Sequence, residues 1–422
     1  MTAHHNTPDR DCSTDLQQQV QNAIRKINLL NPDSQLERGI ALTTLTPPSQ
    51  PSPLKGEGAI PLTPRGGGPG WGEPLSRHPV IPNATMNGLS ALNICGSGSK
   101  HFLGRAAQGE NLSLVEHRGI IEYDPRELVL TARAGTPLAD IETALSDSGQ
   151  MLTFEPPHFG TSATLGGTIA CGLSGPRRPY AGAARDAVLG CKIINGKGEI
   201  LSFGGQVMKN VAGYDVSRLM VGAYGTLGVL LEVSLKVLPR PAASLTLMHE
   251  HSAAESIRHM SQLLSQPMPV DAACYHAGHT YTRISGSDQA VKHAQVQMGG
   301  DLINDTDAFW QNVREQQHPF FKSSKPLYRV MVKPATPALD LDGEWLLDWG
   351  GAQRWLLSDE PAALIRERVS AAGGHVNVYK NNSSSDDIFT PLPGPLFAIH
   401  QRLKLSFDPH RILNPERIYA GL

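Results

Sequence analysis

The spacing of apolar residues predicts an amphipathic helix near the start of the chain. Within residues 15–28, apolar residues recur every three or four positions: Leu16, Val20, Ala23, Ile24 and Ile27. A stripe with this period falls on one face of a helix and can pack against a core. The sequence therefore predicts that a short helix opens the fold.

Further along, short apolar runs predict strands. Residues 91–94, ALNI, form a short buried strand candidate, and residues 127–133, ELVLTAR, form another that precedes a helix ending at Gly149. Beyond residue 242 the predicted order is strand, helix, two strands, helix and strand. That order is typical of a split βαβ sandwich, the ferredoxin-like plan. We expect this second layer to cover a site on the first.

Residues 46–79 interrupt these patterns. Nine prolines and seven glycines in this segment disfavour both helix and strand, so it is predicted to be a low-complexity insert. It contains PRGGGPGWG, residues 64–72, which looks like a phosphate-binding loop. Such a loop needs a preceding strand and free backbone N–H groups. The prolines here lack an N–H group and disfavour a strand before the loop. We interpret it as linker, and expect its deletion to leave ligand binding intact.

A second glycine loop has the context that the first lacks. Residues 96–100, GSGSK, follow the predicted strand and bring together flexible backbone, hydroxyl groups and one cation. Small residues also dominate residues 160–175, and glycines punctuate residues 222–228. From the residues alone, these segments are either places where backbone approaches a ligand or sites of tight packing and ordinary turns.

Composition narrows the classes of function. A chain of 422 residues can hold two or three domains, and its net charge of −2 gives no reason to expect nucleic acid as a partner. The five cysteines include no CxxC pair, which argues against a disulfide framework and a cysteine-ligated metal or cluster. No secretory signal or long apolar stretch stands out, so we expect a cytoplasmic protein.

Several motifs together resemble the FAD-binding domain of the vanillyl-alcohol-oxidase/p-cresol-methylhydroxylase (PCMH) group. The motifs are GSGSKHFLG at 96–104, PPHFGTSATLGGTIACGLSGPRR at 156–178, RDAVLG at 185–190, the glycine-rich segment 209–241 and FDPHRILNPER at 407–417. Within that group, GGQVMKNVAGYD, WGGAQRWL and PGPLFAIHQRLK are similar to the FAD-binding subunits of bacterial glycolate oxidase complexes. The resemblance covers most of the chain outside the insert.

The resemblance implies an α+β fold with a two-subdomain PCMH-type FAD-binding domain followed by a ferredoxin-like α/β cap domain. We expect four segments: the N-terminal helix and its connection at 1–45, the insert at 46–79, the FAD-binding domain at 80–241 together with the N-terminal helix, and the cap domain with a helical tail at 242–422.

The resemblance also implies which residues bind FAD. Those expected around the pyrophosphate are Gly96, Ser97, Gly98, Ser99 and Lys100. Those expected to let the chain pass close to the flavin and its phosphates are Thr164, Gly166 and Gly167, and those lining the remaining groove are Gly225, Gly228 and Val229. Arg185 either joins this set or braces the domain. Relatives with covalent flavin carry a histidine where this chain has Ser99, so noncovalent FAD is expected.

The implied reaction is oxidation of a 2-hydroxy acid, glycolate, to glyoxylate within a multi-subunit complex. The implied partners are a second FAD-binding subunit and an iron–sulfur subunit, located at the inner face of the cytoplasmic membrane through the complex. Catalytic relatives carry an HxGDGNxH metal motif, whereas this chain has only His375 in GHVNV, so no metal site is expected. Two hypotheses stay open: a subunit that oxidises the substrate itself, or a non-catalytic electron-transfer or assembly subunit.

Overall fold

The computed structural model describes residues 9–30, 91–106, 108–205, 215–381 and 388–422. The insert at 46–79, with its loop at 64–72, and most of the motif GGQVMKNVAGYD lie outside the described residues. Residues Met1–Ile27 and Met86–Leu422 belong to one compact unit, and all contacts reported below lie within it.

The helix predicted at the start of the chain is confirmed as α1 (Ser13–Leu30). Leu16, Val20 and Ala23 are buried in the hydrophobic core of the first sheet, as their spacing predicts. On the polar side of the same helix, Gln17 Nε2 donates to the carbonyl oxygen of Gly198 at 2.8 Å.

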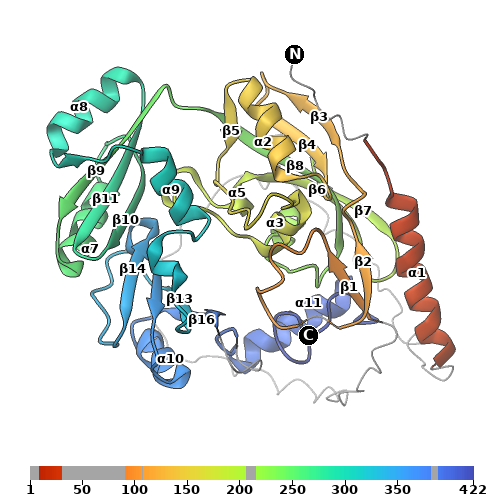
Figure 1. Ribbon diagram of the computed structural model, residues 1–422. Helices are drawn as coiled ribbons and strands as arrows, with labels where there is room; N and C mark the ends of the chain where they lie inside the picture. Colours follow the sequence, from red (N-terminus) through yellow and green to blue (C-terminus); the bar gives the residue numbers. More distant parts are fainter. Residues whose placement is uncertain (1–8, 31–90, 107, 206–214, 382–387) are drawn as a thin grey trace, which may run out of the picture. The chain divides into compact units, whose positions relative to one another are not determined.

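The first sheet is antiparallel and has the strand order β3-β4-β8-β6-β7, with β5 paired to β8 (Figure 1). Its strands are β3 (Ile120–Asp124), β4 (Val129–Arg133), β5 (Gln150–Leu152), β6 (Val188–Ile194), β7 (Ile200–Gly204) and β8 (Val229–Pro239). Its helices are α2 (Leu138–Asp147), α3 (Leu165–Cys171), α4 (Arg178–Ala181), α5 (Ala184–Ala187) and α6 (Val216–Leu219).

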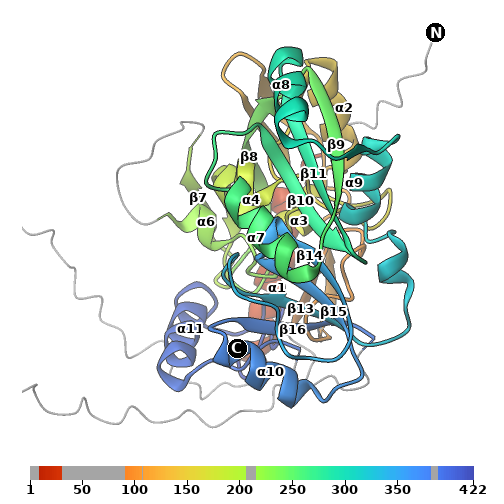
Figure 2. The ribbon, with the colours of Figure 1, turned by 90° about the vertical axis from the view of Figure 1, so that its left-hand side faces the viewer.

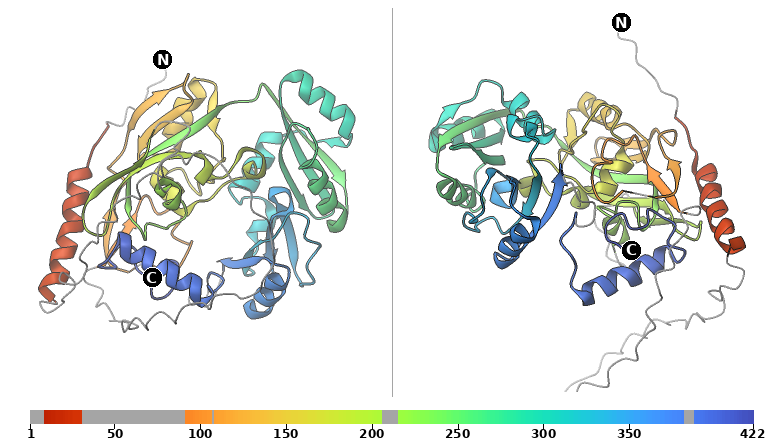
Figure 3. Two further views of the ribbon diagram at one scale, coloured as in Figure 1. Left: turned by 180° about the vertical axis from the view of Figure 1, so that it is seen from behind. Right: turned by 60° about the horizontal axis from the view of Figure 1, so that its bottom comes forward.

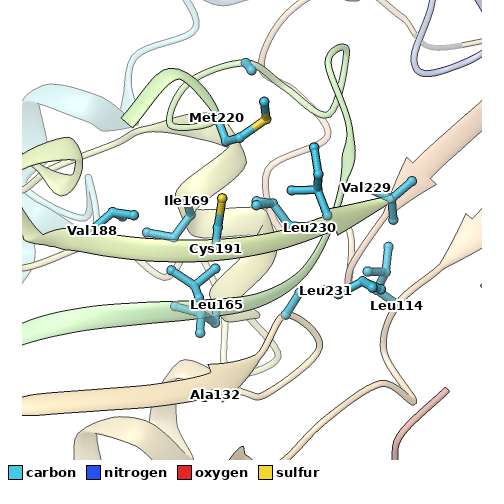
Figure 4. Close-up of a cluster of buried hydrophobic side chains, with 14 of the residues drawn as sticks. Leu114, Ala132, Leu165, Ile169, Val188, Cys191, Met220, Val229, Leu230 and Leu231 are labelled. Atoms are coloured by element: carbon cyan, nitrogen blue, oxygen red, sulfur yellow. The ribbon is translucent and has the colours of Figure 1, made fainter. Parts of the chain in front are cut away.

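The short helix α3 packs on this sheet through its apolar side. Leu165 and Ile169, both fully buried, lie among Cys191 of β6 and Leu231 of β8 (Figure 4). Because this packing fixes α3, its N-terminal end has a defined place above the sheet.

A two-stranded parallel sheet, β1 (Leu92–Cys95) and β2 (Glu110–Ser113), stands beside the first sheet. The C-terminal tail supplies the free edge of β1 with partners. Leu92 N–H donates to the carbonyl of Ile412 at 2.7 Å, and Asn414 N–H donates to the carbonyl of Leu92 at 3.0 Å.

The C-terminal tail packs with a different domain from the one expected. The sequence predicts one segment, 242–422, for the cap domain and the tail, yet Ile412 and Leu413 lie in the core of the first sheet. The physical reason is the edge of β1, whose N–H and C=O groups are satisfied by the returning chain. The helix before the tail is α11 (Gly394–Phe407). It lies next to β1 in Figure 1, and the left view of Figure 3 shows it from the opposite side.

The second sheet has eight antiparallel strands in the order β12-β9-β11-β10-β14-β15-β13-β16. They are β9 (Ala243–Glu250), β10 (Val270–His276), β11 (His279–Gly286), β12 (Asp301–Leu302), β13 (Leu327–Met331), β14 (Glu344–Asp348), β15 (Gln353–Leu357) and β16 (His375–Lys380). In each half, the strands numbered by sequence stand in the order 4-1-3-2, the ferredoxin-like order, and the two halves join through β10 and β14. The α+β fold class predicted from the sequence is confirmed.

Helices cover both faces of the first half of this sheet (Figure 2). They are α7 (Ala253–Leu263), α8 (Asp288–Met298) and α9 (Thr306–Arg314), and the second half carries α10 (Ala362–Ala371). Leu247 packs with side chains of α7 and α8, whereas its neighbour Thr246 accepts a 2.9 Å hydrogen bond from Trp310 Nε1 of α9. Because neighbouring residues of a strand face opposite sides, α9 lies on the other face.

Four charged side chains join the two sheets. Arg283 of β11 contacts Asp271 of β10 at 2.6 Å and Glu155 of the first layer at 2.8 Å. Arg177 completes the ring, with Nη2 at 2.5 Å from Asp271 and Nε at 3.3 Å from Glu155. We call these residues the four-charge ring. Each charge has two opposite neighbours, so the ring compensates all four buried charges where the two sheets meet.

Within the described residues, no helix has both the length and the hydropathy needed to cross a bilayer.

Removal of Asp408 should unfold the tail. Lys404 Nζ, fully buried, donates to Asp408 Oδ2, to Thr226 O and to Leu413 O, each at 2.7 Å. Asp408→Ala leaves this ammonium without its carboxylate, and we expect the free energy of unfolding in urea to fall by about 3–5 kcal/mol. Asp124→Ala breaks an exposed pair with Arg126 and should change little. Equal effects of the two substitutions would contradict this role of Asp408.

Candidate functional site

Two overlapping cavities of about 390 and 470 Å³ form one groove beside the first sheet. Four segments bound it: the loop after β1, the N-terminal end of α3, the loop before β8 and the C-terminal tail. The residues that line both cavities are Ile94, Cys95, Gly96, Thr164, Gly167, Ala170, Tyr224 and Asn414. We call this space the groove.

Ten of the twelve residues expected to bind the cofactor line the groove. They are Gly96, Ser97, Gly98, Ser99, Lys100, Thr164, Gly166, Gly167, Gly225 and Gly228. The other two do not line it. Arg185 is exposed on the short helix α5, and Val229 is buried in the core at the start of β8.

The loop after β1 can lie against α3 because of Gly96. A Cβ atom on Gly96 would stand 2.3 Å from Thr164 Oγ1, closer than any real contact. Thr164 in turn caps α3, since its Oγ1 accepts a hydrogen bond from Gly167 N–H at 3.3 Å. Gly98 then turns the loop with a φ of +83°, in the left-handed region that favours glycine. The two glycines thus shape the wall of the groove.

This loop presents unused donors to the groove. Among the described residues, the backbone N–H groups of Ser97, Gly98, Ser99 and Lys100 have no hydrogen-bond acceptor. Successive free N–H groups in a tight loop form a concave site for an anion such as a phosphate. By contrast, the N–H groups of Leu165 and Gly166 at the start of α3 already donate to carbonyls of Thr136 and Ala134. The loop, rather than the helix end, has the free donors.

Two cations stand beside these donors. Lys100 is buried, and its Nζ lies 3.2 Å from the carbonyl oxygen of His158; burial lowers its pKa. Arg417 of the tail donates from Nη2 to the carbonyl of His101 at 3.1 Å and from Nη1 to the carbonyl of Arg105. The end of the groove at the loop is therefore electropositive, which suits a phosphate group.

Asn414 holds the groove together, and sequence reasoning missed it. Its Oδ1 accepts from Ile94 N–H at 2.7 Å, and its Nδ2 donates to the carbonyl of Tyr224 at 2.7 Å. One side chain thus joins β1 to the loop before β8. Arg417 and Tyr224 were missed as well. The signal was present in FDPHRILNPER, the tail motif that marks the family, but its contact with β1 spans 320 residues.

A second cavity of about 330 Å³ lies between the two sheets, and we call it the inner cavity. Its lining residues are Pro157, Phe159, Leu173, Ser174, Gly175, Pro176, Val313, Arg314, Gln316, Arg329, Asp348, Gln353, Trp355 and Tyr379. Arg329 Nε donates to Gln353 Oε1 at 2.6 Å, and Gln353 Nε2 donates to Asp348 Oδ2 at 3.2 Å. Burial raises the pKa of Asp348 to about 7.

The histidine considered in the sequence as a remnant of a metal motif stands apart. His375 is exposed at the start of β16 and lines neither the groove nor the inner cavity. In the part of the chain that the structure describes, no group of three or more His, Cys, Asp or Glu side chains is arranged to hold a metal ion.

The chain is similar to several known proteins. The FAD binding domain family model matches residues 84–204. The glycolate oxidase subunit GlcE of Escherichia coli (strain K12) is 50% identical over 340 residues, which make up 81% of this chain and 96% of that protein. The glycolate oxidase subunit GlcD of Bacillus subtilis (strain 168) is 32% identical over 41% of this chain and 34% of that protein.

Among solved structures, alkyldihydroxyacetonephosphate synthase is similar with a TM-score of 0.54 and 13% identity, covering 77% of this chain and 71% of that one. This likeness concerns the fold alone. The family model bears out FAD as the cofactor, and together with this likeness it bears out the PCMH-type fold.

A negative charge in the loop after β1 should weaken FAD binding. Gly98→Asp and Gly98→Asn place side chains of the same shape at a backbone conformation that both residues tolerate. Only Asp repels a phosphate, so we expect its FAD affinity to be at least about tenfold lower than that of Asn. Flavin absorbance per chain after dialysis measures the difference. Equal flavin content in the two variants would contradict the loop assignment.

The ionisation of Asp348 should make stability depend on pH. Its pKa is raised to about 7 in the fold by burial, against roughly 3.9 in an unfolded chain. Between these values the folded state binds more protons, so this group's contribution to stability is lost as pH rises from about 4 to about 7. Asp348→Asn should remove that part of the decline in Tm. If Tm depends on pH in the same way in the unaltered protein and in Asp348→Asn, Asp348 does not titrate between about pH 4 and about pH 7 as expected.

Proposed function

Because this chain belongs to the family of the glycolate oxidase subunit GlcE and carries an FAD-binding domain, we propose that it is the FAD-binding subunit of a complex that oxidises glycolate to glyoxylate. The observation that carries the proposal is the groove, in which the predicted loop, helix end and β8 loop meet. An iron–sulfur subunit and a second FAD-binding subunit are the proposed partners.

The residues of the groove fit FAD. Ser97, Gly98, Ser99 and Lys100 would hold the pyrophosphate through their free N–H groups, with the Lys100 and Arg417 cations beside it. Thr164, Gly166 and Gly167 would line the passage to the flavin, where Gly225 and Gly228 form the opposite side. When bound, FAD supplies the acceptor for the hydride that leaves the carbon bearing the substrate hydroxyl group.

We propose that the FAD is held noncovalently. Ser99 occupies the position where relatives with covalent flavin carry histidine. The groove also contains the thiol of Cys171, and burial raises its pKa to about 11. A thiol reacts as the thiolate, so this group stays protonated and unreactive at neutral pH. Acid precipitation should therefore release all the flavin into solution.

A test of the proposed function compares the chain alone with the chain in its complex. Each preparation is mixed with glycolate without oxygen, and the flavin absorbance is followed. We expect bleaching in the complex, because glycolate reduces flavin there, and bleaching in the isolated chain if the chain has its own substrate site. Bleaching of the complex alone would favour the electron-transfer or assembly subunit. No bleaching in either preparation would contradict glycolate as the substrate.

A further inference from the structure

A buried histidine between β2 and β3 connects four segments of the first domain. His117 is fully buried, its backbone N–H donates to the carbonyl of Leu114 at 2.9 Å, and its own carbonyl accepts from Gly135 N–H at 2.8 Å. The ring reaches two further segments. Nδ1 accepts from Cys12 N–H at 3.0 Å, and Nε2 lies 3.1 Å from the carbonyl oxygen of Leu231. All the polar groups of this residue are thus hydrogen-bonded.

The partners of the His117 ring fix its tautomer. A carbonyl oxygen only accepts, so Nε2 carries the hydrogen that it donates to Leu231. A backbone N–H only donates, so Nδ1 carries none when it accepts from Cys12. The ring is therefore neutral. Protonation would put a second N–H group at Nδ1, facing the Cys12 N–H, and this hydrogen bond would be lost.

The charges around the ring do not offset the cost of protonating it. Burial is the main cause that lowers the pKa of His117, and the nearby Arg133 of β4 lowers it further. Asp11 and Glu232 of β8 raise it by less, so the pKa stays below its ordinary value. Asp11 is the closest carboxylate, with Oδ1 3.6 Å from Nδ1, but it is half exposed and also lies 3.9 Å from Arg133. Acid is needed to charge the ring.

The segments that His117 bonds form part of the wall of the groove. Three residues that line the groove are a partner of His117 or precede one in the chain: Leu114, Ala134 and Leu230. The carbonyl of Leu231 also accepts from Ala134 N–H at 2.7 Å, and the carbonyl of Ala134 accepts from Gly166 N–H of α3 at 2.7 Å. His117 therefore lies directly behind this wall.

On its other side, His117 holds the chain at the start of α1. The Cys12 N–H that bonds the ring comes one residue before Ser13, where α1 begins. Two residues earlier, Arg10 pairs with Arg118 in an antiparallel bridge, with hydrogen bonds of 3.0 and 3.1 Å. We call residues 9–12 the N-terminal segment. This segment fixes the end of α1 against the sheet that carries the groove.

We propose that neutral His117 is a positioning residue that couples the N-terminal segment to the cofactor groove, so that its protonation releases α1 and weakens FAD binding. The inference rests on FAD as the cofactor of the groove and not on glycolate as the substrate. Coupling of this kind is reciprocal. If release of α1 weakens FAD binding, bound FAD must oppose the release by the same factor.

The first measurement follows α1 in the unaltered, FAD-loaded chain as the pH is lowered. After release, His117 regains its ordinary pKa of about 6.5, above that of the buried ring. Each pH unit below about 6.5 should favour release roughly tenfold, until the lowered pKa of the buried ring is reached. Amide exchange of α1 measures this as a protection factor, which corrects for the pH dependence of the exchange chemistry. Constant protection between about pH 7.5 and about pH 5.5 would overturn the proposal.

The second measurement compares the unaltered chain with and without FAD at about pH 5.5, where release is favoured. We expect bound FAD to raise the protection factors of α1 several-fold, because the groove and the N-terminal segment share His117. Flavin absorbance confirms that FAD is bound. Equal protection of α1 in the two samples would contradict the coupling.

His117→Asn separates the two bonds of the ring. Asparagine has an acceptor oxygen near the place of Nδ1, so it can still bond Cys12, but it is too short to reach Leu231 and does not titrate. In this variant the protection of α1 should no longer fall with pH in this range, nor rise when FAD binds. His293→Asn removes an exposed histidine of α8 and is the matched control, which should behave like the unaltered chain. If His117→Asn does not fold, the two measurements on the unaltered chain decide.

Reduction of the complex by glycolate is measured in parallel. Protection of α1 that depends on FAD and on His117, in a complex that glycolate does not reduce, would support the coupling and contradict the proposed function. Reduction by glycolate, with α1 indifferent to FAD, would contradict the coupling and leave the proposed function standing.

Discussion

The groove depends on how the chain satisfies one edge of a short strand. β1 pairs with β2 on one side, and its other side offers the N–H groups of Leu92 and Ile94. The tail returns to accept both, through the carbonyl of Ile412 and the side chain of Asn414. Since the same Asn414 side chain also donates to the carbonyl of Tyr224, satisfying this edge also ties the loop before β8 to β1 across the groove.

The second layer is held by a different kind of contact. The four-charge ring joins two strands of the second sheet to the first layer, and Trp349 Nε1 donates to the carbonyl of Gly175 at 2.9 Å. Loss of one member of the ring would leave a buried charge without its partner, which is strongly destabilising. The groove and the inner cavity are lined by members of one apolar cluster, which contains Cys171, Tyr224 and Tyr379. The groove and the inner cavity thus depend on two separate sets of contacts.

The sequence predicted the parts of the site that lie close together along the chain. The strand before Gly96 and the glycine content of residues 96–100 were enough to prefer this loop over the more regular glycine loop at 64–72, which lies outside the described residues. Local pattern could not reveal Asn414, since its role comes from a contact across 320 residues. Nor could local pattern reveal Arg329 and Asp348. They lie on separate strands, β13 and β14, and only the strand order of the second sheet brings them together. Arg185, which the motif also suggested, is exposed on α5 and does not line the groove.

We propose that the loop after β1 holds the FAD phosphates through backbone N–H groups that have no acceptor among the described residues. Amide hydrogen exchange measures this directly, by comparing the protein with and without FAD. We expect slower exchange on FAD binding at Ser97, Gly98, Ser99 and Lys100, because FAD would give these N–H groups an acceptor. Protection confined to other segments, with unchanged exchange at these four residues, would contradict it.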